Sequence, residues 1–204
     1  FSTPEVYGDI KKPLKENFNF SPSTPYATSR ASLDIHLKNL YYNYKLPVIF
    51  TRTANVFGPT QQTYRIIPKS IICIRKNQKI FLDGGGNSIR SFIFIDDVSE
   101  ALCKIIAKGK LGETYHISTD QFISIKKIVK KIERLLNNKK KLVFNRKDRI
   151  GKDHSYKLSS KKIRKNLKWK PKIHIEDGIN KTMNWIENNF EYLSRVDTNY
   201  KHKR

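Results

Sequence analysis

The sequence predicts an α/β protein. Segments with apolar residues at helical spacing alternate along the 204 residues with short runs rich in β-branched and aromatic residues. Hydrophobic residues make up 38% of the chain and aromatic residues 11%, enough to build a core. No internal repeat is visible. Alternating helices and strands are typical of a sheet covered by helices.

The first half of the chain is expected to contain a helix, a strand and a second helix. Residues 25–45 have helical periodicity, and residues 48–52, VIFTR, form a run typical of a buried strand. The second helix is expected around residues 68–76. The stripe of the first helix expected to face the core consists of Leu33, Leu37, Leu40, Tyr41 and Tyr44.

A glycine-rich run, Asp83 to Gly86, stands between two expected strands in KIFLDGGG-NSIRSFIFI. It lacks the Lys-Ser/Thr pair of a phosphate loop and does not open a helix, so it is interpreted as a turn. The sequence contains no dinucleotide-binding glycine fingerprint anywhere else.

The second half continues the alternation. A helix should begin with Asp96 or Asp97 as its N-cap and stop at Gly109. Its inward side chains are expected to be Val98, Ala101, Leu102, Ile105 and Ile106. Further strands are expected at residues 113–118 and 141–144, and further helices at residues 125–136, 159–168 and 175–188.

The net charge of +23 raises the possibility of nucleic-acid binding, since most of the excess lies between Lys126 and Lys172. The lysines of residues 125–136, however, fall opposite an apolar stripe and are interpreted as a solvated helix face. The sequence has no zinc-finger, KH or RNP signature. A basic nucleic-acid-binding protein stays open as the alternative from another class.

The two cysteines, Cys73 and Cys103, both sit inside apolar runs without metal-ligand spacing. They are expected to be reduced core thiols, which fits a cytoplasmic protein without a metal site. No apolar run approaches the roughly 20 residues that a bilayer span requires, so no membrane contact is expected.

The residues best suited to acid–base catalysis lie near the N-terminus. Tyr26 and Arg30 are four residues apart at the start of the first helix, so their side chains project from one face. A cation beside a phenol favours the phenolate form, which can act as a base. The hydroxyl of Thr3 could hold a substrate oxygen. A Tyr-x-x-x-Arg pair alone is common and more often serves packing and the surface.

A series of motifs gives these residues a context. The chain contains STPEVYGD, SPSTPYATSRAS, LPVIFTRTANVFGP, RIIP, RSFIFIDDVSEAL, GETYHIS and DRIGKDHSYKLSSKKI in this order. In order and spacing they resemble the C-terminal two-thirds of extended short-chain dehydrogenase/reductases that act on nucleotide sugars. The likeness covers residues 1 to 190 and is strongest to the NDP-sugar 4,6-dehydratases of the dTDP-glucose 4,6-dehydratase type.

The resemblance implies the C-terminal part of a Rossmann-like NAD(P)-binding domain and a small α/β substrate-binding domain. Residues 1–60 are assigned to the first. Residues 61–193 are assigned mainly to the second, with some segments returning to the first, and residues 194–204 to a polar tail. The family's glycine-rich NAD loop lies upstream of STPEVYG, so the chain is expected to be an inactive fragment. A homodimer is expected for the full-length form.

The same resemblance implies roles for the N-terminal residues. Tyr26 matches the base that takes the sugar 4-hydroxyl proton while hydride passes to NAD, and Thr3 matches the hydroxyl that binds the same oxygen. Glu5 matches the carboxylate that removes the C5 proton. Arg30 stands where the family usually has a lysine, which together with the tyrosine contacts the cofactor. Pro4 stands where dTDP-glucose dehydratases have an aspartic acid.

Substrate binding is likewise implied by family positions. The matching residues are Asn55, Arg65, Arg90, Arg149 and Tyr156. Asp120 stands where the dTDP-sugar enzymes have asparagine, so recognition of the base is expected to differ. An NAD-dependent sugar-nucleotide epimerase, a UDP-glucuronate decarboxylase-like enzyme and a non-catalytic remnant stay open as alternatives.

Overall fold

A computed structural model describes residues 1–148 and 153–199 of the chain, which divides into two units. Unit 1 comprises the described parts of residues 1–56, 88–122 and 150–172. Unit 2 comprises the described parts of residues 57–87, 123–149 and 173–204. Each unit is thus assembled from separate stretches of the sequence.

Unit 1 is built around short strands. Strand β1 (Phe50–Thr53) pairs in parallel with β6 (Thr114–Ile117), with Phe50 opposite Thr114 and Thr53 opposite Ile117. Strand β2 (Asn55–Phe57) pairs with β5 (Phe92–Phe94). All four residues of β6 are buried, as expected for a parallel strand covered on both faces.

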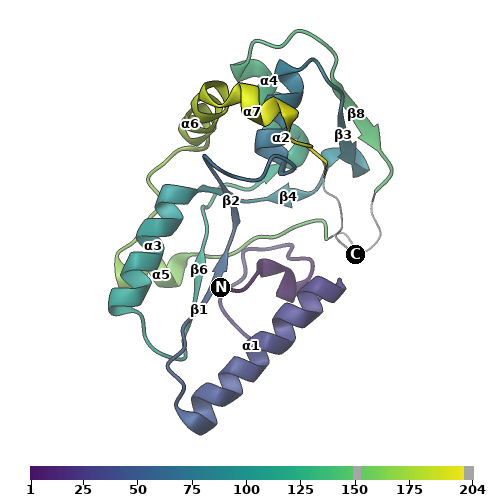
Figure 1. The fold of residues 1–204 in the computed structure, drawn as a ribbon. Coiled ribbons are helices and arrows are strands. Elements are labelled where there is room, and N and C mark those ends of the chain that lie inside the picture. Colours follow the sequence, from purple (N-terminus) through teal and green to yellow (C-terminus); the bar gives the residue numbers. More distant parts are fainter. Residues whose placement is uncertain (149–152, 200–204) are drawn as a thin grey trace. The chain divides into compact units, whose positions relative to one another are not determined.

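Helices cover both faces of β1 and β6, with α3 and α1 on opposite sides (Figure 1). Helix α3 (Ile95–Lys108) and helix α5 (Lys161–Leu167) contribute to one apolar cluster with the strands. The fully buried members of this cluster include Ile117, Ile163 and Trp169. A second cluster joins α1 to the N-terminal segment and consists of Val6, Tyr7, Ile10, Ala31 and Leu158.

Helix α1 (Pro25–Tyr44) begins at a Thr24 N-cap whose Oγ1 accepts the Ala27 N–H at 3.1 Å. Its buried residues are Ala27, Ala31 and Asp34. The predicted core stripe is therefore wrong, because Leu33 and Tyr44 are exposed and Leu37, Leu40 and Tyr41 are only half-buried. The small alanine side chains let α1 approach the N-terminal segment closely.

The N-terminal segment forms a 3₁₀-helix, Pro4–Tyr7, in unit 1. Isolated parallel bridges attach this segment to the rest of the unit, Ser2 opposite Arg52 and Leu14 opposite Leu158. Strand β4 (Ile89–Arg90) has an equivalent bridge from Ile89 to Ser155. The Leu14 bridge and the hydrogen bond from the Ile10 N–H to the Ser155 carbonyl place residues 10–14 beside residues 155–158.

Unit 2 packs helices against a second pair of strands. Strand β3 (Ile80–Asp83) pairs in parallel with β8 (Val143–Arg146). Its helices are α2 (Ile66–Arg75), α4 (Ile125–Leu135), α6 (Ile175–Asn188) and α7 (Phe190–Arg195), and β7 (Ile123–Ser124) precedes α4. The core includes Cys73, Ile80, Leu82 and Val129.

The glycine run of unit 2 forms a turn, as predicted. Gly84–Gly86 is one 3₁₀ turn, and all three glycines have φ between 59° and 70°. A Cβ at Gly84 would lie 2.4 Å from a carboxylate oxygen of Asp148. The turn is not a hairpin, since β3 and β4 belong to different pairs of strands.

Three details of the expected elements differ in the structure. Helix α3 begins at Ile95 after Phe94, and neither aspartate is its N-cap. Ile106 is 83% exposed and does not face the core. Cys73 is a buried free thiol as predicted, but the free thiol of Cys103 is exposed, so its assignment to the core is wrong. Among the described residues, no helix is long and apolar enough to cross a membrane.

Candidate active site

The start of the 3₁₀-helix in unit 1 carries two of the predicted catalytic residues. Thr3 is its N-cap, and Thr3 Oγ1 accepts the backbone N–H of Glu5 at 3.3 Å. Thr3 is buried, while Glu5 is half-buried. Pro4 lies between them at the first helical position, where its missing N–H leaves no helix hydrogen bond unmade.

Helix α1 presents the other two catalytic candidates. The Tyr26 side chain is 57% exposed, so its phenol is accessible from solvent. The Arg30 guanidinium donates to the backbone carbonyl of Phe1. Arg30 Nε is buried and has no hydrogen-bond partner within the part of the chain that the structure describes. The hydrogen bond from Arg30 to Phe1 thus attaches the first turns of α1 to the residues just before Thr3.

Arg90 and Tyr156 form a second group in unit 1. The Arg90 guanidinium donates to the carbonyls of Ile89 and Asp153 at 2.8 Å each, and to that of His154 at 3.2 Å. Its central carbon lies 4.1 Å from the centre of the Tyr156 ring. The Tyr156 hydroxyl donates to Oδ2 of Asp153 at 2.6 Å.

Burial dominates the electrostatics of this group. Burial raises the pKa of Tyr156, and the hydrogen bond to Asp153 and the negative charge of Glu5 raise it further. Burial lowers the pKa of Arg90, against the opposing influence of Tyr156, Asp153 and Glu5. The Glu5 carboxylate is therefore close enough to act on both groups, and Tyr156 is a neutral hydrogen-bond donor at neutral pH.

Backbone contacts explain why Glu5 lies near Tyr156. The Ser155 N–H donates to Oδ1 of Asp9 at 2.6 Å, and the Ile10 N–H donates to the Ser155 carbonyl at 2.8 Å. The segment that follows Glu5 is in this way attached to the residue that precedes Tyr156. Unit 1 thus brings the two groups into one neighbourhood.

Asn55 and Asp120 also belong to unit 1. The backbone N–H of Asn55 donates to the carbonyl of Ser91 at 3.0 Å, immediately after Arg90. The exposed Asp120 carboxylate pairs with Arg164 at 2.8 Å. The Asp120 carboxylate is therefore already paired with a cation of α5. Any role of Asp120 in recognising the nucleotide base has to take this ion pair into account.

The remaining two predicted arginines are not among the described residues of unit 1. Arg65 belongs to unit 2, where it is the exposed N-cap residue of α2 and its guanidinium carbon lies 5.5 Å from the centre of the Tyr64 ring. Arg149 lies outside the described residues.

Several charged partners were not predicted. Asp153 and Asp9 hold the Tyr156 segment, and Asp34 pairs with Arg52 in the interior of unit 1. The only signal in the sequence for Asp34 is its place four residues after Arg30. Arg52 sits inside the apolar run VIFTR, where a cation requires a buried partner.

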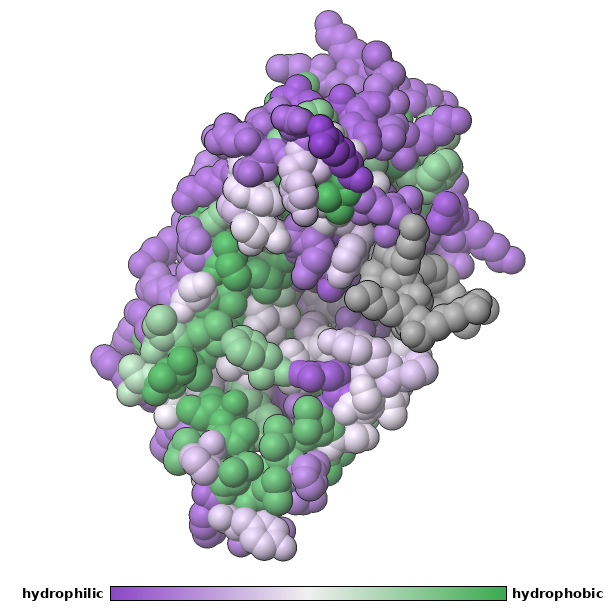
Figure 2. All heavy atoms as spheres, in the orientation of Figure 1, coloured by the Kyte–Doolittle hydropathy of each residue, from purple (hydrophilic) through white to green (hydrophobic). Residues whose placement is uncertain are grey.

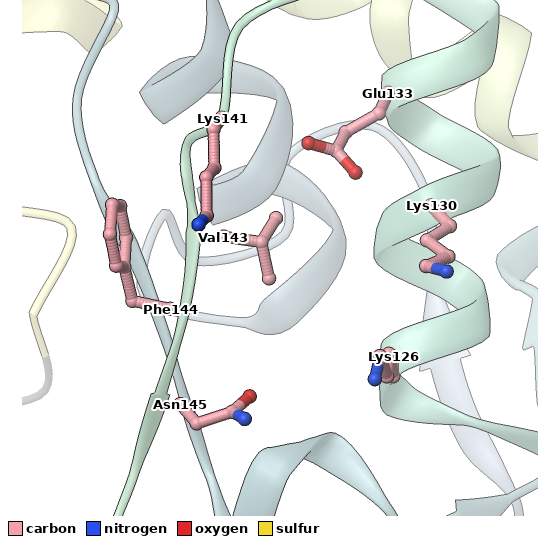
Figure 3. A pocket seen from close by; sticks show the side chains of 7 residues that line it. All are labelled: Lys126, Lys130, Glu133, Lys141, Val143, Phe144 and Asn145. Atoms are coloured by element: carbon pink, nitrogen blue, oxygen red, sulfur yellow. The ribbon is translucent and has the colours of Figure 1, made fainter.

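A hollow of about 390 Å³ in unit 2 lies between α4 and β8 (Figure 3). Its lining residues are Lys126, Lys130, Glu133, Lys141, Val143, Phe144 and Asn145. None of the predicted site residues lines it, and its lysines are exposed. We therefore place the candidate active site in unit 1.

Comparison with known proteins identifies the family of the chain. The family model described as GDP-mannose 4,6 dehydratase matches residues 1–182. The chain belongs to this family. The human dTDP-D-glucose 4,6-dehydratase is 35% identical to this family member over 203 residues, covering 96% of the chain and 58% of the relative. The Escherichia coli dTDP-glucose 4,6-dehydratase is 33% identical over 217 residues, with 96% and 60% covered.

Solved structures show the same fold. A dTDP-glucose 4,6-dehydratase from Streptomyces venezuelae, solved with NAD bound, superposes on this GDP-mannose 4,6-dehydratase family member with a TM-score of 0.90 and 29% identity, covering 94% of the chain and 60% of the other. The Bacillus anthracis enzyme, also in complex with NAD, gives 0.87 and 32%, with 94% and 61% covered. The predicted Rossmann-like α/β class and the family resemblance are confirmed, and the chain spans about 60% of the length of these relatives.

Proposed function

We propose that this chain is the catalytic and substrate-binding part of an NAD-dependent nucleotide-sugar 4,6-dehydratase, with dTDP-glucose as the first candidate substrate. The observation that carries the proposal is the arrangement within unit 1. Arg30 attaches helix α1 to the residues before Thr3, and Asp9 and Ile10, which follow Glu5 in the chain, bond to Ser155 beside Tyr156. The relatives at 35% and 33% identity are named as dTDP-glucose dehydratases.

In this proposal Tyr26 removes the proton from the sugar 4-hydroxyl. Its exposed phenol stands one helical turn before Arg30 and is accessible to a substrate. The Thr3 hydroxyl accepts the Glu5 N–H and keeps its own hydrogen to donate to the same sugar oxygen. Two groups from different segments thereby fix one substrate oxygen.

Residues of α1 fit the nicotinamide end of NAD. The buried Nε of Arg30, without a partner in the described chain, is a donor that a ribose hydroxyl could satisfy. When bound, NAD would supply reversible hydride acceptance at the sugar ring. Tyr26 and Arg30 are the cofactor-contacting residues of this proposal.

Glu5 removes the proton at C5, which becomes acidic once C4 is a ketone. Arg90 lies close enough to influence this carboxylate, and Tyr156 stays protonated beside it. Pro4 has no proton to give, so the proton for the departing 6-hydroxyl comes from Glu5 or from water. Because three Arg90 hydrogen bonds go to backbone carbonyls, Arg90 orders this region as well as supplying charge.

Product analysis tests the function. A protein that carries these residues together with a dinucleotide-binding segment is incubated with NAD and dTDP-glucose, and the product is analysed by NMR. We expect a 4-keto-6-deoxy sugar nucleotide. A C4 epimer would favour the epimerase alternative, and a pentose from UDP-glucuronate would favour the decarboxylase. No turnover, with DNA binding that falls steeply with salt, would favour the nucleic-acid alternative.

The proposal includes a homodimer and a cytoplasmic location. Helix α1 exposes Leu33, Ile35, Tyr42 and Tyr44. Figure 2 shows hydrophobic residues gathered over the lower part of unit 1, where α1 lies. Such a surface suits association with a second copy. The two free thiols fit a reducing compartment. Light scattering of the purified protein and fractionation of cells would test these two points.

A further inference from the structure

A buried ion pair in unit 1 joins helix α1 to strand β1. Nη2 of Arg52 lies 2.7 Å from Oδ2 of Asp34, and both side chains are almost fully buried. Arg52 also donates to the Tyr7 hydroxyl at 2.8 Å. Desolvation of two charges offsets much of their attraction, so a buried pair is weak support for stability alone. A role in fixing geometry accounts better for its presence.

The same carboxylate reaches the segment that carries Thr3. The Ser2 hydroxyl donates to Oδ2 of Asp34 at 2.6 Å. The Ser2 backbone N–H donates to the carbonyl of Thr51 at 2.8 Å. Ser2 is therefore fixed from α1 and from β1 immediately before Thr3.

Asp34 continues the stripe of α1 that carries the proposed base. Tyr26, Arg30 and Asp34 are spaced four residues apart, which places them on one helix face. Arg30 donates to the carbonyl of Phe1, and Asp34 accepts from Ser2. Two successive positions of the stripe thus bind two successive residues of the segment that leads to Thr3.

We propose that Asp34, held by Arg52, is a positioning residue that sets Thr3 and Glu5 in register with Tyr26 through the Ser2 hydroxyl. This inference rests on the proposed function, because the register matters when these residues act on one sugar. A misplacement of about 1 Å in such a site can lower the rate by about a hundredfold.

The kinetic test uses Ser2→Ala, which removes the link and leaves the Asp34–Arg52 pair intact. In a protein that also carries a dinucleotide-binding segment, we expect kcat to fall about tenfold or more while KM changes by less than about twofold. Ser2→Thr keeps a hydroxyl and should restore most of kcat. Ser99→Ala is the matched control, since the exposed Ser99 hydroxyl donates to the Ile95 carbonyl of its own helix at 3.1 Å.

A second measurement needs no activity. In this 204-residue chain, hydrogen exchange of the Glu5 amide, which is bonded to Thr3 Oγ1, should be faster in Ser2→Ala than in the parent or in Ser99→Ala. Unchanged exchange overturns the positioning role. So does an unchanged kcat in an active enzyme, or a Ser2→Thr variant as slow as Ser2→Ala. If the parent makes no 4-keto product, the proposed function fails, and the exchange result alone decides the positioning role.

Discussion

The hydroxyl of Tyr7 lies 2.9 Å from Nε2 of His116 in the interior of unit 1. His116 is fully buried, and the backbone N–H of His116 donates to Glu16 at 3.0 Å. Burial lowers the pKa of His116 to about 3, and the nearby positive charge of Arg52 acts in the same direction. The imidazole is therefore neutral in the folded chain at neutral pH.

Because His116 is neutral in the folded chain, the free energy of unfolding is expected to fall at acidic pH. Below pH 6.5, the ordinary value, an unfolded His116 takes up a proton, whereas the folded one does not until about pH 3. The unfolded state binds more protons across this window, so stability falls as the pH falls. Lowering the pH from about 7 to about 5 should cost about 2 kcal/mol through His116 alone.

Urea unfolding of the parent and of His116→Gln at the two pH values measures this contribution. The loss of stability on acidification should be about 2 kcal/mol smaller in His116→Gln. Burial raises the pKa of Glu16 above its ordinary value of 4.5, so acidification towards that value increases the stability contributed by Glu16. This contribution is the same in the parent and in His116→Gln, so it cancels in the comparison. His36→Asn, at an exposed position of α1, should behave as the parent. Equal losses in all three proteins would contradict the prediction.

Removing the Tyr156 hydroxyl should destabilise unit 1. Tyr156→Phe keeps the ring beside Arg90 but takes the 2.6 Å donor from the buried carboxylate of Asp153. We expect a loss of about 1–3 kcal/mol in the free energy of unfolding. Tyr192→Phe is a suitable control, since Tyr192 is exposed on α7. A loss no larger than that of the control would show that the bond contributes nothing.

Arg30 should be replaceable by the lysine that family enzymes usually have. Arg30→Lys keeps the positive charge one turn after Tyr26 and can still reach the Phe1 carbonyl as a donor. We expect kcat within about tenfold of the parent for Arg30→Lys, and a loss of about a hundredfold or more for Arg30→Met. Steady-state kinetics of the two variants decide the matter, and equal losses would argue against the role of the charge.

The 204 residues alone should bind NAD weakly, because they contain no glycine fingerprint for the pyrophosphate. Calorimetric titration of the isolated chain should give a Kd far above about 1 μM. Joining the chain to a segment with that fingerprint should produce tight binding. Submicromolar binding by the isolated chain would overturn this expectation.

The regular elements of both units follow from local patterns in the sequence. Helix α4 begins after the Ser124 cap, as predicted, and Ser124 Oγ accepts the Lys127 N–H. Gly109 ends α3, also as predicted. These features depend on residues close together in the chain, so a single sequence is sufficient to locate them.

The buried face of α1 and the interior ion pairs depend on contacts between segments that are distant in the sequence. Ala27 and Ala31 are buried residues of α1, and Ala31 packs in one cluster with residues of the N-terminal segment, so a pattern based on large apolar residues misses this face. Ion pairs such as Arg52 with Asp34 join residues on different elements, and spacing does not reveal them. The catalytic candidates were found through motif resemblance, while Asp153 and Asp9 emerged only from the fold.

The most direct test of the dehydratase proposal is a rapid-quench single turnover of Glu5→Gln, using substrate deuterated at C5 and an enzyme that also carries a dinucleotide-binding segment. If Glu5 serves the elimination and Tyr26 the oxidation, Glu5→Gln accumulates NADH and a 4-keto hexose without loss of water, and Tyr26→Phe in the same assay forms no NADH. Release of dehydrated product by Glu5→Gln at the parental rate, or normal NAD reduction by Tyr26→Phe, would contradict the assigned roles.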